Sequence, residues 1–385
     1  MISDNILKFI SMLLNKSSSI NFFILFIVTI IFSFGFILLY SAAGGSMDPW
    51  ATKQLTRYLF AVVIFIIASL INIKFWLGLS YYIYFFSIIL LIMVGIFGYV
   101  GMGAQRWLDL GFFNLQPSEL IKFSIILVLA KYFHAEKNYN LWDNIKNFII
   151  PMLLILVPSY LIFLQPDLGS TVLLLIASLT ILFIIGLSLW FFVTSALMCI
   201  IAAPFIWFLL LYDYQKNRIL TFIDPNKDPL GSGYHIIQSK IALGSGGLFG
   251  KGFLEGTQSH LNFLPEMQTD FIFTLLAEEF GLIGTIILLL LYIILIFYCL
   301  VIGIISNSRF GCFVAIGVSI NIFYYVFVNT AMVCGLIPVV GVPLPLVSYG
   351  GTSMLCVMFG LGLVSNVYVH RNIKIERYKD GILGW

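Results

Sequence analysis

Long runs of apolar residues, separated by short polar segments, make up most of this chain. A helix that crosses a membrane needs about 20 consecutive apolar residues. About ten runs approach this length, and we expect membrane-spanning helices at residues 20–41, 58–73, 75–99, 119–133, 148–164, 168–186, 188–211, 271–305, 311–335 and 351–369. The first run is too long, and begins too far into the chain, to be a cleaved signal peptide. The pattern therefore predicts an all-α, polytopic membrane protein.

One connection is much longer than the others. Residues 212–270, between the seventh and eighth predicted helices, are rich in glycine but also contain Ile, Leu and Phe at intervals. Connections of this length are usually functional. The apolar residues favour an ordered extracytoplasmic loop with short amphipathic helices on the membrane surface over a flexible linker. We expect no separate soluble domain, so residues 1–385 form a single transmembrane domain in this interpretation.

The composition excludes several other classes of protein. Hydrophobic residues make up 61% of the chain and charged residues only 10%, whereas soluble domains carry about 25% charged residues. The mean hydropathy is +1.06. A soluble globular enzyme is therefore excluded, and the 37 Phe and 19 Tyr exclude a disordered chain. A net charge of +3 without a dense basic stripe gives no indication of nucleic-acid binding.

The distribution of Lys and Arg predicts the orientation of the chain. With an even number of spans, both termini lie on one side of the membrane. The basic residues gather on that side, which we expect to be cytoplasmic: Lys8, Lys16, Lys74, Lys131, Lys137, Lys146, Arg309, Arg371, Lys374, Arg377 and Lys379. Many acidic residues fall on the opposite side. They are compatible with metal binding or acid–base chemistry there, although displacement of basic residues to the inside also explains part of this asymmetry.

Two predicted spans begin with ionisable residues, which cost about 2.5–3.5 kcal/mol each at the centre of a span. Glu119 and Lys122 are three residues apart, so they share one face of the fourth helix and can pair. The pair either fixes helix packing or presents the lysine charge to an anionic substrate. Asp167 precedes the sixth helix, where it either caps that helix or lines a cavity open to the outside.

Asp270 is placed where the long loop returns to the membrane. Asp270, Thr274 and Glu278 follow one another at four-residue spacing, which gives an otherwise apolar helix one polar face. A carboxyl group at this boundary is partly desolvated. Partial desolvation raises its pKa and suits it to general-base catalysis.

Other polar patterns in the sequence do not indicate a catalytic site by themselves. The ninth span has a polar stripe that predicts hydrogen bonds between helices, formed by Asn321, Tyr325 and Asn329. Segment 246–252 resembles a phosphate loop but lacks the Gly and the Ser/Thr that the Walker pattern requires, so an ATPase is excluded. Lys251, among glycines, is still able to contact a pyrophosphate. The five cysteines and four histidines show no spacing typical of a disulfide framework or a zinc site.

Several longer phrases resemble the SEDS family (shape, elongation, division and sporulation). They are QPSE at 116–119, QPDLG at 165–169, NFLPEMQTDFIF at 262–273, AEEFG at 277–281 and LVSYGGTS at 346–353. Three further phrases are more similar to the elongation branch, RodA, than to the division branch, FtsW: DPLGSGYH at 228–235, the glycine run 244–252 and GLIPVVGVPLP at 335–345. One departure is that Gln268 stands where many members carry His.

The resemblance implies a peptidoglycan glycosyltransferase of cell elongation and cell-shape maintenance. Such an enzyme polymerises lipid II, an undecaprenyl-pyrophosphate-linked disaccharide-pentapeptide, at the outer face of the bacterial inner membrane. The resemblance also implies a divalent cation, Mg²⁺ or Mn²⁺, with ligands that the sequence does not identify. No nucleotide is expected, because the substrate carries its own leaving group. The implied partners are a class B penicillin-binding transpeptidase and the elongation complex.

The resemblance assigns the family's essential aspartate to Asp270, which we expect to deprotonate the acceptor hydroxyl. It assigns the supporting membrane-embedded residues to Glu119, Lys122 and Asp167. Further candidates for the cavity or for substrate binding are Arg106, Lys251, Glu266 and Ser348. A metal ion near Asp270, assisted by Lys251 or Arg106, would offset the charge of the leaving pyrophosphate.

Two other functions remain open from the sequence. A flippase would move the same lipid across the bilayer, and it fits a polar cavity between helices that are interrupted by Pro and Gly. A non-catalytic scaffold would only hold the transpeptidase. Neither needs a base at the boundary of the outer loop, so replacement of Asp270 separates both from the enzyme.

Overall fold

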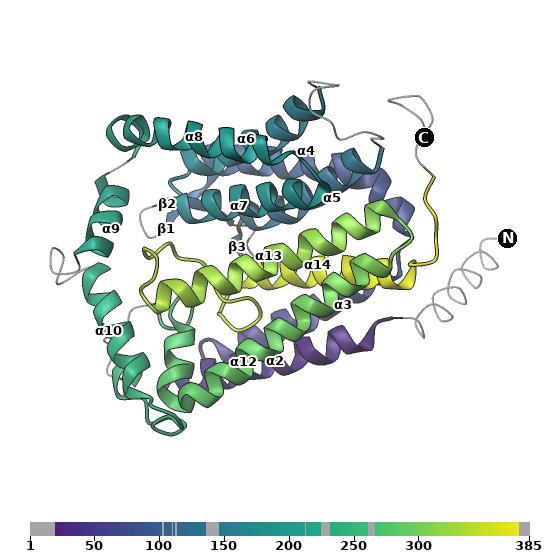
Figure 1. The fold of residues 1–385 in the computed structure, drawn as a ribbon. Coiled ribbons are helices and arrows are strands. Elements are labelled where there is room, and N and C mark those ends of the chain that lie inside the picture. Colours follow the sequence, from purple (N-terminus) through teal and green to yellow (C-terminus); the bar gives the residue numbers. More distant parts are fainter. Residues whose placement is uncertain are drawn as a thin grey trace.

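The computed structural model describes residues 20–101, 104–109, 111, 114–135, 146–211, 213–224, 232–260 and 266–376. Helices dominate this part of the chain, and the long ones lie side by side in a bundle (Figure 1). They are α2 (Phe22–Ala42), α3 (Ala51–Leu70), α4 (Ile73–Phe97), α5 (Pro117–Ala135), α6 (Lys146–Leu164), α7 (Leu168–Ile185), α8 (Leu189–Phe205), α12 (Ile272–Ile305), α13 (Arg309–Val333) and α14 (Gly351–Val369). A π-helical turn, η1 (Ile206–Leu210), continues α8.

Each of these long helices overlaps one predicted span, which confirms the all-α, polytopic prediction. In the described residues, eight helices are long and apolar enough to cross a membrane. The other two are α5, which contains charged residues, and α6, whose apolar part is the shorter Ile149–Leu164. The chain is therefore a multi-pass membrane protein, and its number of spans stays a prediction.

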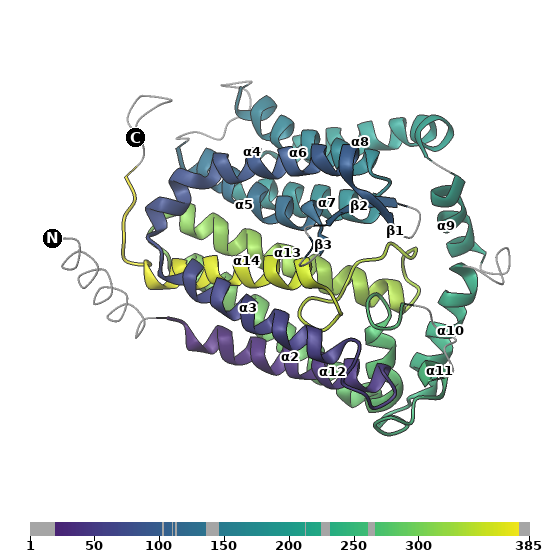
Figure 2. The ribbon, with the colours of Figure 1, turned by 180° about the vertical axis from the view of Figure 1, so that it is seen from behind.

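The long connection contains short helices, as expected from its apolar residues: α9 (Asp213–Ile223), α10 (Ser232–Ser245) and α11 (Thr257–His260). Figure 1 shows α9 and α10 across one end of the bundle, whereas α2 begins and α14 ends at the opposite end, and Figure 2 shows the same arrangement from behind. Their placement on the membrane surface stays a prediction. Residues 212, 225–231 and 261–265 of this connection lie outside the described residues, and they include part of the motif at 262–273.

A small antiparallel sheet between α4 and α5 was not expected from the sequence. Its strands are β1 (Tyr99–Gly101), β2 (Ala104–Asp109) and β3 (Asn114–Leu115), in the order β1-β2-β3. Strands this short do not produce a clear alternating pattern. The sheet matters because it places Arg106, on β2, at the same end of the bundle as α9.

The core of the bundle depends on close helix contacts. Helix α3 packs along α14, and a Cβ added at Gly362 of α14 would lie 2.9 Å from the carbonyl oxygen of Phe65. The side chain of Asn366 donates hydrogen bonds of 3.0 Å to the carbonyls of Ala68 and Ser69, so the end of α3 is tied to α14. Helix α3 also begins earlier than the predicted span at 58–73, because its first turns are polar and the apolar pattern does not detect them.

The helix predicted over residues 271–305 is present as α12, but it contains a kink that the sequence did not predict. Gly281 has φ 64° and ψ −161°, so α12 consists of a short helix, 272–280, and a long one, 282–305. The glycine-rich loop 246–252 packs at this kink. Gly247 accepts a hydrogen bond of 3.0 Å from Leu282 N–H, and Lys251 N–H donates one of 2.9 Å to the carbonyl of Glu278. This loop, which resembles a phosphate loop, therefore packs against backbone.

Replacement of Gly281 by Ala is expected to destabilise the protein. The added Cβ would lie 2.3 Å from the backbone nitrogen of Gly250, and the backbone conformation at Gly281 disfavours any other residue. We expect a cost of about 1–3 kcal/mol or more, measured as a lower midpoint of thermal unfolding in detergent. Gly95→Ala is the matched control, because that helical glycine has open space around it. Equal midpoints for the two variants would contradict the structural role of the kink.

Candidate active site

A tight turn at residues 266–270 carries Asp270 to the start of α12. Glu266 adopts a left-handed backbone conformation with φ 57°. Its carbonyl oxygen accepts hydrogen bonds from the N–H groups of Thr269 (3.1 Å) and Asp270 (3.2 Å). Its carboxylate accepts one of 3.1 Å from the hydroxyl of Thr269. The turn is therefore stabilised by one of the predicted site residues, Glu266.

Three consecutive carbonyl groups of this turn accept hydrogen bonds from distant parts of the chain. The backbone N–H of Tyr349 donates to Gln268 at 2.8 Å, and the hydroxyl of Ser348 donates to Thr269 at 2.5 Å. The side-chain amide of Asn329, on α13, donates to Asp270 at 3.0 Å. The backbone next to Asp270 is thus held by α13 and by the segment that leads into α14.

These contacts change the interpretation of two residues. Ser348 was a candidate for the cavity or for substrate binding, but its buried hydroxyl is occupied by the carbonyl of Thr269 and by the N–H of Leu344, at 2.8 Å. It is a positioning residue. Asn329 was expected to bond between helices. It bonds instead to the loop carbonyls of Asp270 and Val342, the latter at 2.7 Å.

The surroundings of Asp270 raise the pKa of its carboxyl group to about 6. Burial is the largest cause and repulsion from Glu266 adds to it, whereas Arg218 and Arg106 act in the opposite direction. Asp270 lies just outside the spanning part of α12 and keeps part of its surface exposed. A Cβ at Gly341 would lie 3.2 Å from Oδ2, so glycine there leaves the carboxylate uncrowded. The predicted upward shift is confirmed, and such a group is suited to accept a proton.

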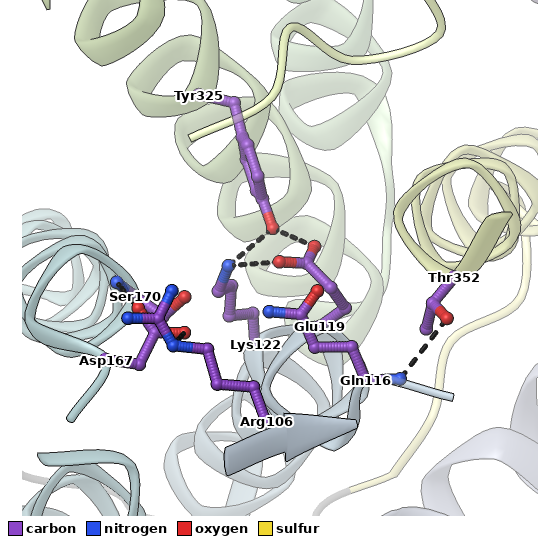
Figure 3. Close-up of polar contacts among 8 residues, drawn as sticks. All are labelled: Arg106, Gln116, Glu119, Lys122, Asp167, Ser170, Tyr325 and Thr352. Atoms are coloured by element: carbon purple, nitrogen blue, oxygen red, sulfur yellow. Dashed lines mark hydrogen bonds and ion pairs between the residues drawn. The ribbon is translucent and has the colours of Figure 1, made fainter. Parts of the chain in front are cut away.

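Asp167 and Arg106 form an ion pair (Figure 3), and both act electrostatically on Asp270. Nε of Arg106 lies 3.7 Å from Oδ2 of Asp167, and the guanidinium also donates to the carbonyl of Pro166 at 2.7 Å. The other oxygen of Asp167 accepts from the N–H of Ser170 at 3.1 Å and caps α7. The capping alternative for Asp167 therefore applies, and its other oxygen pairs with Arg106. That it lines a cavity open to the outside stays a prediction.

Glu119 and Lys122 pair as predicted, with 2.7 Å between Nζ and Oε1. Tyr325, on α13, joins them: its hydroxyl donates to Glu119 and accepts from Lys122, the latter at 2.7 Å. Figure 3 shows this cluster opposite the pair of Arg106 and Asp167. All three members are buried, and a buried ion pair needs further hydrogen bonds to offset desolvation. The polar stripe in the sequence contained Tyr325 but did not indicate these partners.

Lys251 is not where the sequence placed it. Its ammonium lies 2.7 Å from Oε1 of Glu278 and 2.7 Å from the hydroxyl of Thr257. Glu278 lies about two helical turns beyond Asp270, and the charged residues that act on Asp270 are Glu266, Arg218, Arg106 and Asp167. The structure uses Lys251 to neutralise a fully buried carboxylate and does not bring it to Asp270.

Arg218, on α9, was missed by the sequence analysis. It donates to the carbonyl of Val339 at 3.4 Å and acts electrostatically on Asp270. It also lines a largely apolar cavity of about 360 Å³ between α7, α9 and α13, together with Pro166, Leu173, Phe327, Pro338 and Val340. An arginine within a long loop gives no sequence signal of its position, because that position depends on how α9 lies across the bundle.

A divalent cation would find a partial set of ligands here. In the described residues, no group of three or more His, Cys, Asp or Glu side chains is arranged to hold a metal. Glu266 and Asp270 are two carboxylates close enough to repel one another. Mg²⁺ is commonly bound through one or two carboxylates, with water and substrate phosphates as the other ligands. The residues fit an ion shared with a phosphorylated ligand and do not form a closed protein site.

The fold is a multi-pass helical bundle that carries Asp270, a carboxyl group with a raised pKa on which two arginines act. One of these arginines, Arg218, also lines an apolar cavity. These features define a membrane protein with an enzyme-like site. The chain belongs to the FtsW/RodA/SpoVE family of cell cycle proteins, whose family model matches residues 21–373. This match confirms the resemblance to the SEDS family.

Individual relatives match over most of the chain. Peptidoglycan glycosyltransferase MrdB of Escherichia coli K12 is 45% identical over 343 residues, 88% of this chain and 92% of that protein. RodA of Thermus thermophilus matches in structure with a TM-score of 0.69 and 28% identity, over 92% of this chain and 98% of that one. A chain from a peptidoglycan synthase complex, described as coordinating polymerization and crosslinking, matches with a TM-score of 0.78 and 29% identity, over 92% and 98%.

Replacement of Tyr325 by Phe tests the buried cluster. The change removes the hydroxyl that Glu119 and Lys122 share, so we expect the free energy of unfolding to fall by about 1–3 kcal/mol. Tyr324→Phe is the matched control, because the hydroxyl of Tyr324 contacts only the neutral Thr180, at 2.8 Å, in the described residues. Its loss should cost about 0.5–1.5 kcal/mol. Thermal and denaturant unfolding measure both, and an equal or smaller loss for Tyr325→Phe would contradict the proposed stabilisation.

Proposed function

We propose that this chain is a peptidoglycan glycosyltransferase of cell elongation, which joins lipid II units into glycan strands at the outer face of the bacterial inner membrane. Its family membership and the similarity to MrdB support this class of enzyme. The observation that carries the proposal is Asp270, a carboxyl group with a pKa of about 6, partly exposed, at the end of the bundle where α9 and α10 lie.

The reaction follows from the chemistry of the substrate and the position of this carboxylate. Asp270 takes the proton of the acceptor sugar hydroxyl, and the hydroxyl oxygen attacks the anomeric carbon of the donor. The bond from that carbon to undecaprenyl pyrophosphate breaks, and the pyrophosphate leaves with the bonding electrons. The configuration at the carbon inverts. No nucleotide is required, because the donor already carries its activated leaving group.

In this proposal the charged residues around Asp270 have different roles. Arg218 and Arg106 lie close enough to Asp270 to lower its pKa, and they can also offset the charge that develops on the leaving pyrophosphate. Asp167 orients Arg106. Glu119 and Lys122 shape the polar wall opposite this pair. The apolar cavity beside Arg218 is suited to the first part of a polyprenyl chain.

A divalent cation near Asp270 would be held by Glu266 together with phosphate oxygens and water. When bound, it would supply positive charge at the pyrophosphate. We further propose that both termini lie in the cytoplasm, in agreement with the distribution of Lys and Arg, and that a class B penicillin-binding transpeptidase of the elongation complex is the partner. The similarity to a chain of a peptidoglycan synthase complex supports such a partner.

Polymerisation of labelled lipid II by the purified, reconstituted protein tests the proposed function. We expect glycan ladders from the wild type and a loss of at least about 100-fold in Asp270→Asn, because a general base contributes about 10²–10⁴-fold. Glu255→Gln is the control, because Glu255 is an exposed acid of the same outer region. EDTA should abolish the ladders, and Mg²⁺ or Mn²⁺ should restore them.

Three other outcomes would contradict parts of this proposal. Translocation of lipid II without ladders would indicate a flippase. Normal ladders from Asp270→Asn, at equal protein level, would exclude Asp270 as the base. Normal ladders in the presence of EDTA would exclude the cation.

A further inference from the structure

Arg57, in the first turns of α3, is a cation without an acidic partner in the part of the chain that the structure describes. Its guanidinium carbon lies 4.5 Å from the centre of the Tyr349 ring. Its Nη1 atom is shielded from solvent and has no hydrogen-bond partner among the described residues. A cation–π contact leaves the donors of a guanidinium free for other partners. The arginine is thus held in place with Nη1 unpaired among the described residues.

The N-terminus of α14 lies against this guanidinium. A Cβ added at Gly351, the first residue of α14, would be 3.2 Å from Nε of Arg57. Gly350 precedes the helix, and no side chain caps it. The free N–H groups and the dipole of a helix of this length attract anions. Two positive groups therefore meet here, because the missing side chain at Gly351 lets Arg57 approach the end of α14.

Gln54, one turn before Arg57, is a further unused polar group. It is fully buried; its amide nitrogen donates to the carbonyl of Ser348 at 2.9 Å. Its amide oxygen has no partner among the described residues. A buried polar atom without a partner costs about 1–3 kcal/mol. An amide oxygen only accepts hydrogen bonds, so an ordered water is the usual partner of such an atom.

This polar group of residues is adjacent to the turn that carries Asp270. Tyr349, which stacks on Arg57, donates its N–H to Gln268 at 2.8 Å. Arg106 and Arg218 lower the pKa of Asp270, whereas Arg57 is not among the charges that act on it. This is the order expected if Arg57 lies farther from the carboxylate than the other two arginines.

The proposed reaction needs two pyrophosphates at unequal distances from the base. The donor carries its pyrophosphate on the carbon that reacts, so that group must lie close to Asp270. The acceptor reacts through a hydroxyl at the other end of its sugar unit and keeps its own pyrophosphate, which lies one disaccharide away. We propose that Arg57, Tyr349 and the N-terminus of α14 form a second anion subsite, which binds the pyrophosphate of the acceptor lipid. This inference rests on the proposed function.

The test counts bound probe molecules and does not depend on turnover. Full-length protein in phosphatidylcholine nanodiscs is titrated with undecaprenyl pyrophosphate, and the bound equivalents are counted by native mass spectrometry. We expect two equivalents for the wild type and one for Arg57→Gln. Arg57→Lys, which keeps the charge, should retain the second equivalent with about tenfold weaker affinity, the loss expected for one charge-assisted hydrogen bond. Arg218→Gln should lose the other equivalent.

Further variants and lipids keep the test decisive. If Arg57→Gln does not fold, Gly351→Ala replaces it, because the added methyl crowds Nε of Arg57. Phosphatidylglycerol in the nanodiscs distinguishes a phospholipid headgroup site. Displacement of the second equivalent by this lipid at comparable concentration would overturn the assignment to pyrophosphate. One equivalent bound to the wild type, or two bound to Arg57→Gln with unchanged affinity, would overturn the subsite.

Lipid II polymerisation by the same wild-type preparation tests the proposed function separately from the anion subsite. Glycan ladders with only one bound equivalent would contradict the subsite alone. Two equivalents without ladders would contradict the proposed function and leave a second pyrophosphate site in place. In the active enzyme, Arg57→Gln should raise the KM for lipid II about tenfold and change kcat less, because Arg57 binds substrate away from the reacting atoms.

Discussion

Three hydrogen bonds to consecutive carbonyl groups fix the position of Asp270. A chain that turns into a membrane leaves backbone groups without water, and each unsatisfied group costs several kcal/mol. Here the carbonyls of Gln268, Thr269 and Asp270 accept from Tyr349, Ser348 and Asn329. These donors follow in the sequence by 59 to 81 residues, so the turn keeps its shape only when α13 and the segment before α14 are in place. The hydrogen bonds that satisfy these backbone groups therefore also fix the part of the backbone that carries the carboxylate.

Burial and neighbouring charges shift the pKa of Asp270 in opposite directions. Burial and Glu266 favour the neutral form of Asp270, whereas Arg218 and Arg106 favour the charged form, and the resulting pKa of about 6 lies close to physiological pH. Stronger burial alone would leave the group protonated, and stronger pairing would make it a poor base. The arginines thus serve two purposes, because the charge that tunes the base is also suited to an anionic leaving group. Arg57 adds a further cation beside Tyr349, one of the residues that hold the turn.

Local patterns in the sequence were sufficient for the helices and for one ion pair. The apolar runs located every long helix of the described residues, and the spacing of Glu119 and Lys122 predicted their ion pair, because an i, i+3 contact depends only on the helix. The apolar pattern did not reveal the kink at Gly281, since the residues on both sides of it are equally apolar and the break depends on loop 246–252 packing there.

Contacts between distant segments were not predictable in this way. Tyr325 and Asn329 were recognised as polar positions, but their partners lie on α5 and in the loops. Arg218 and Lys251 belong to the same long connection, yet the structure brings only Arg218 to Asp270 and pairs Lys251 with Glu278. Which of two basic residues reaches the site depends on how α9 and α10 cross the bundle. No property of the residues themselves determines it.

The dependence of lipid II polymerisation on pH tests the assignment of Asp270 as the base most directly. Because the carboxyl group must be ionised to accept a proton, kcat/KM should be constant above pH 7 and fall as the pH drops through about 6. Arg218→Gln removes a charge that lowers this pKa and should move the profile to higher pH. A profile that is flat between pH 5 and 8, or one that Arg218→Gln does not move, would contradict the assignment.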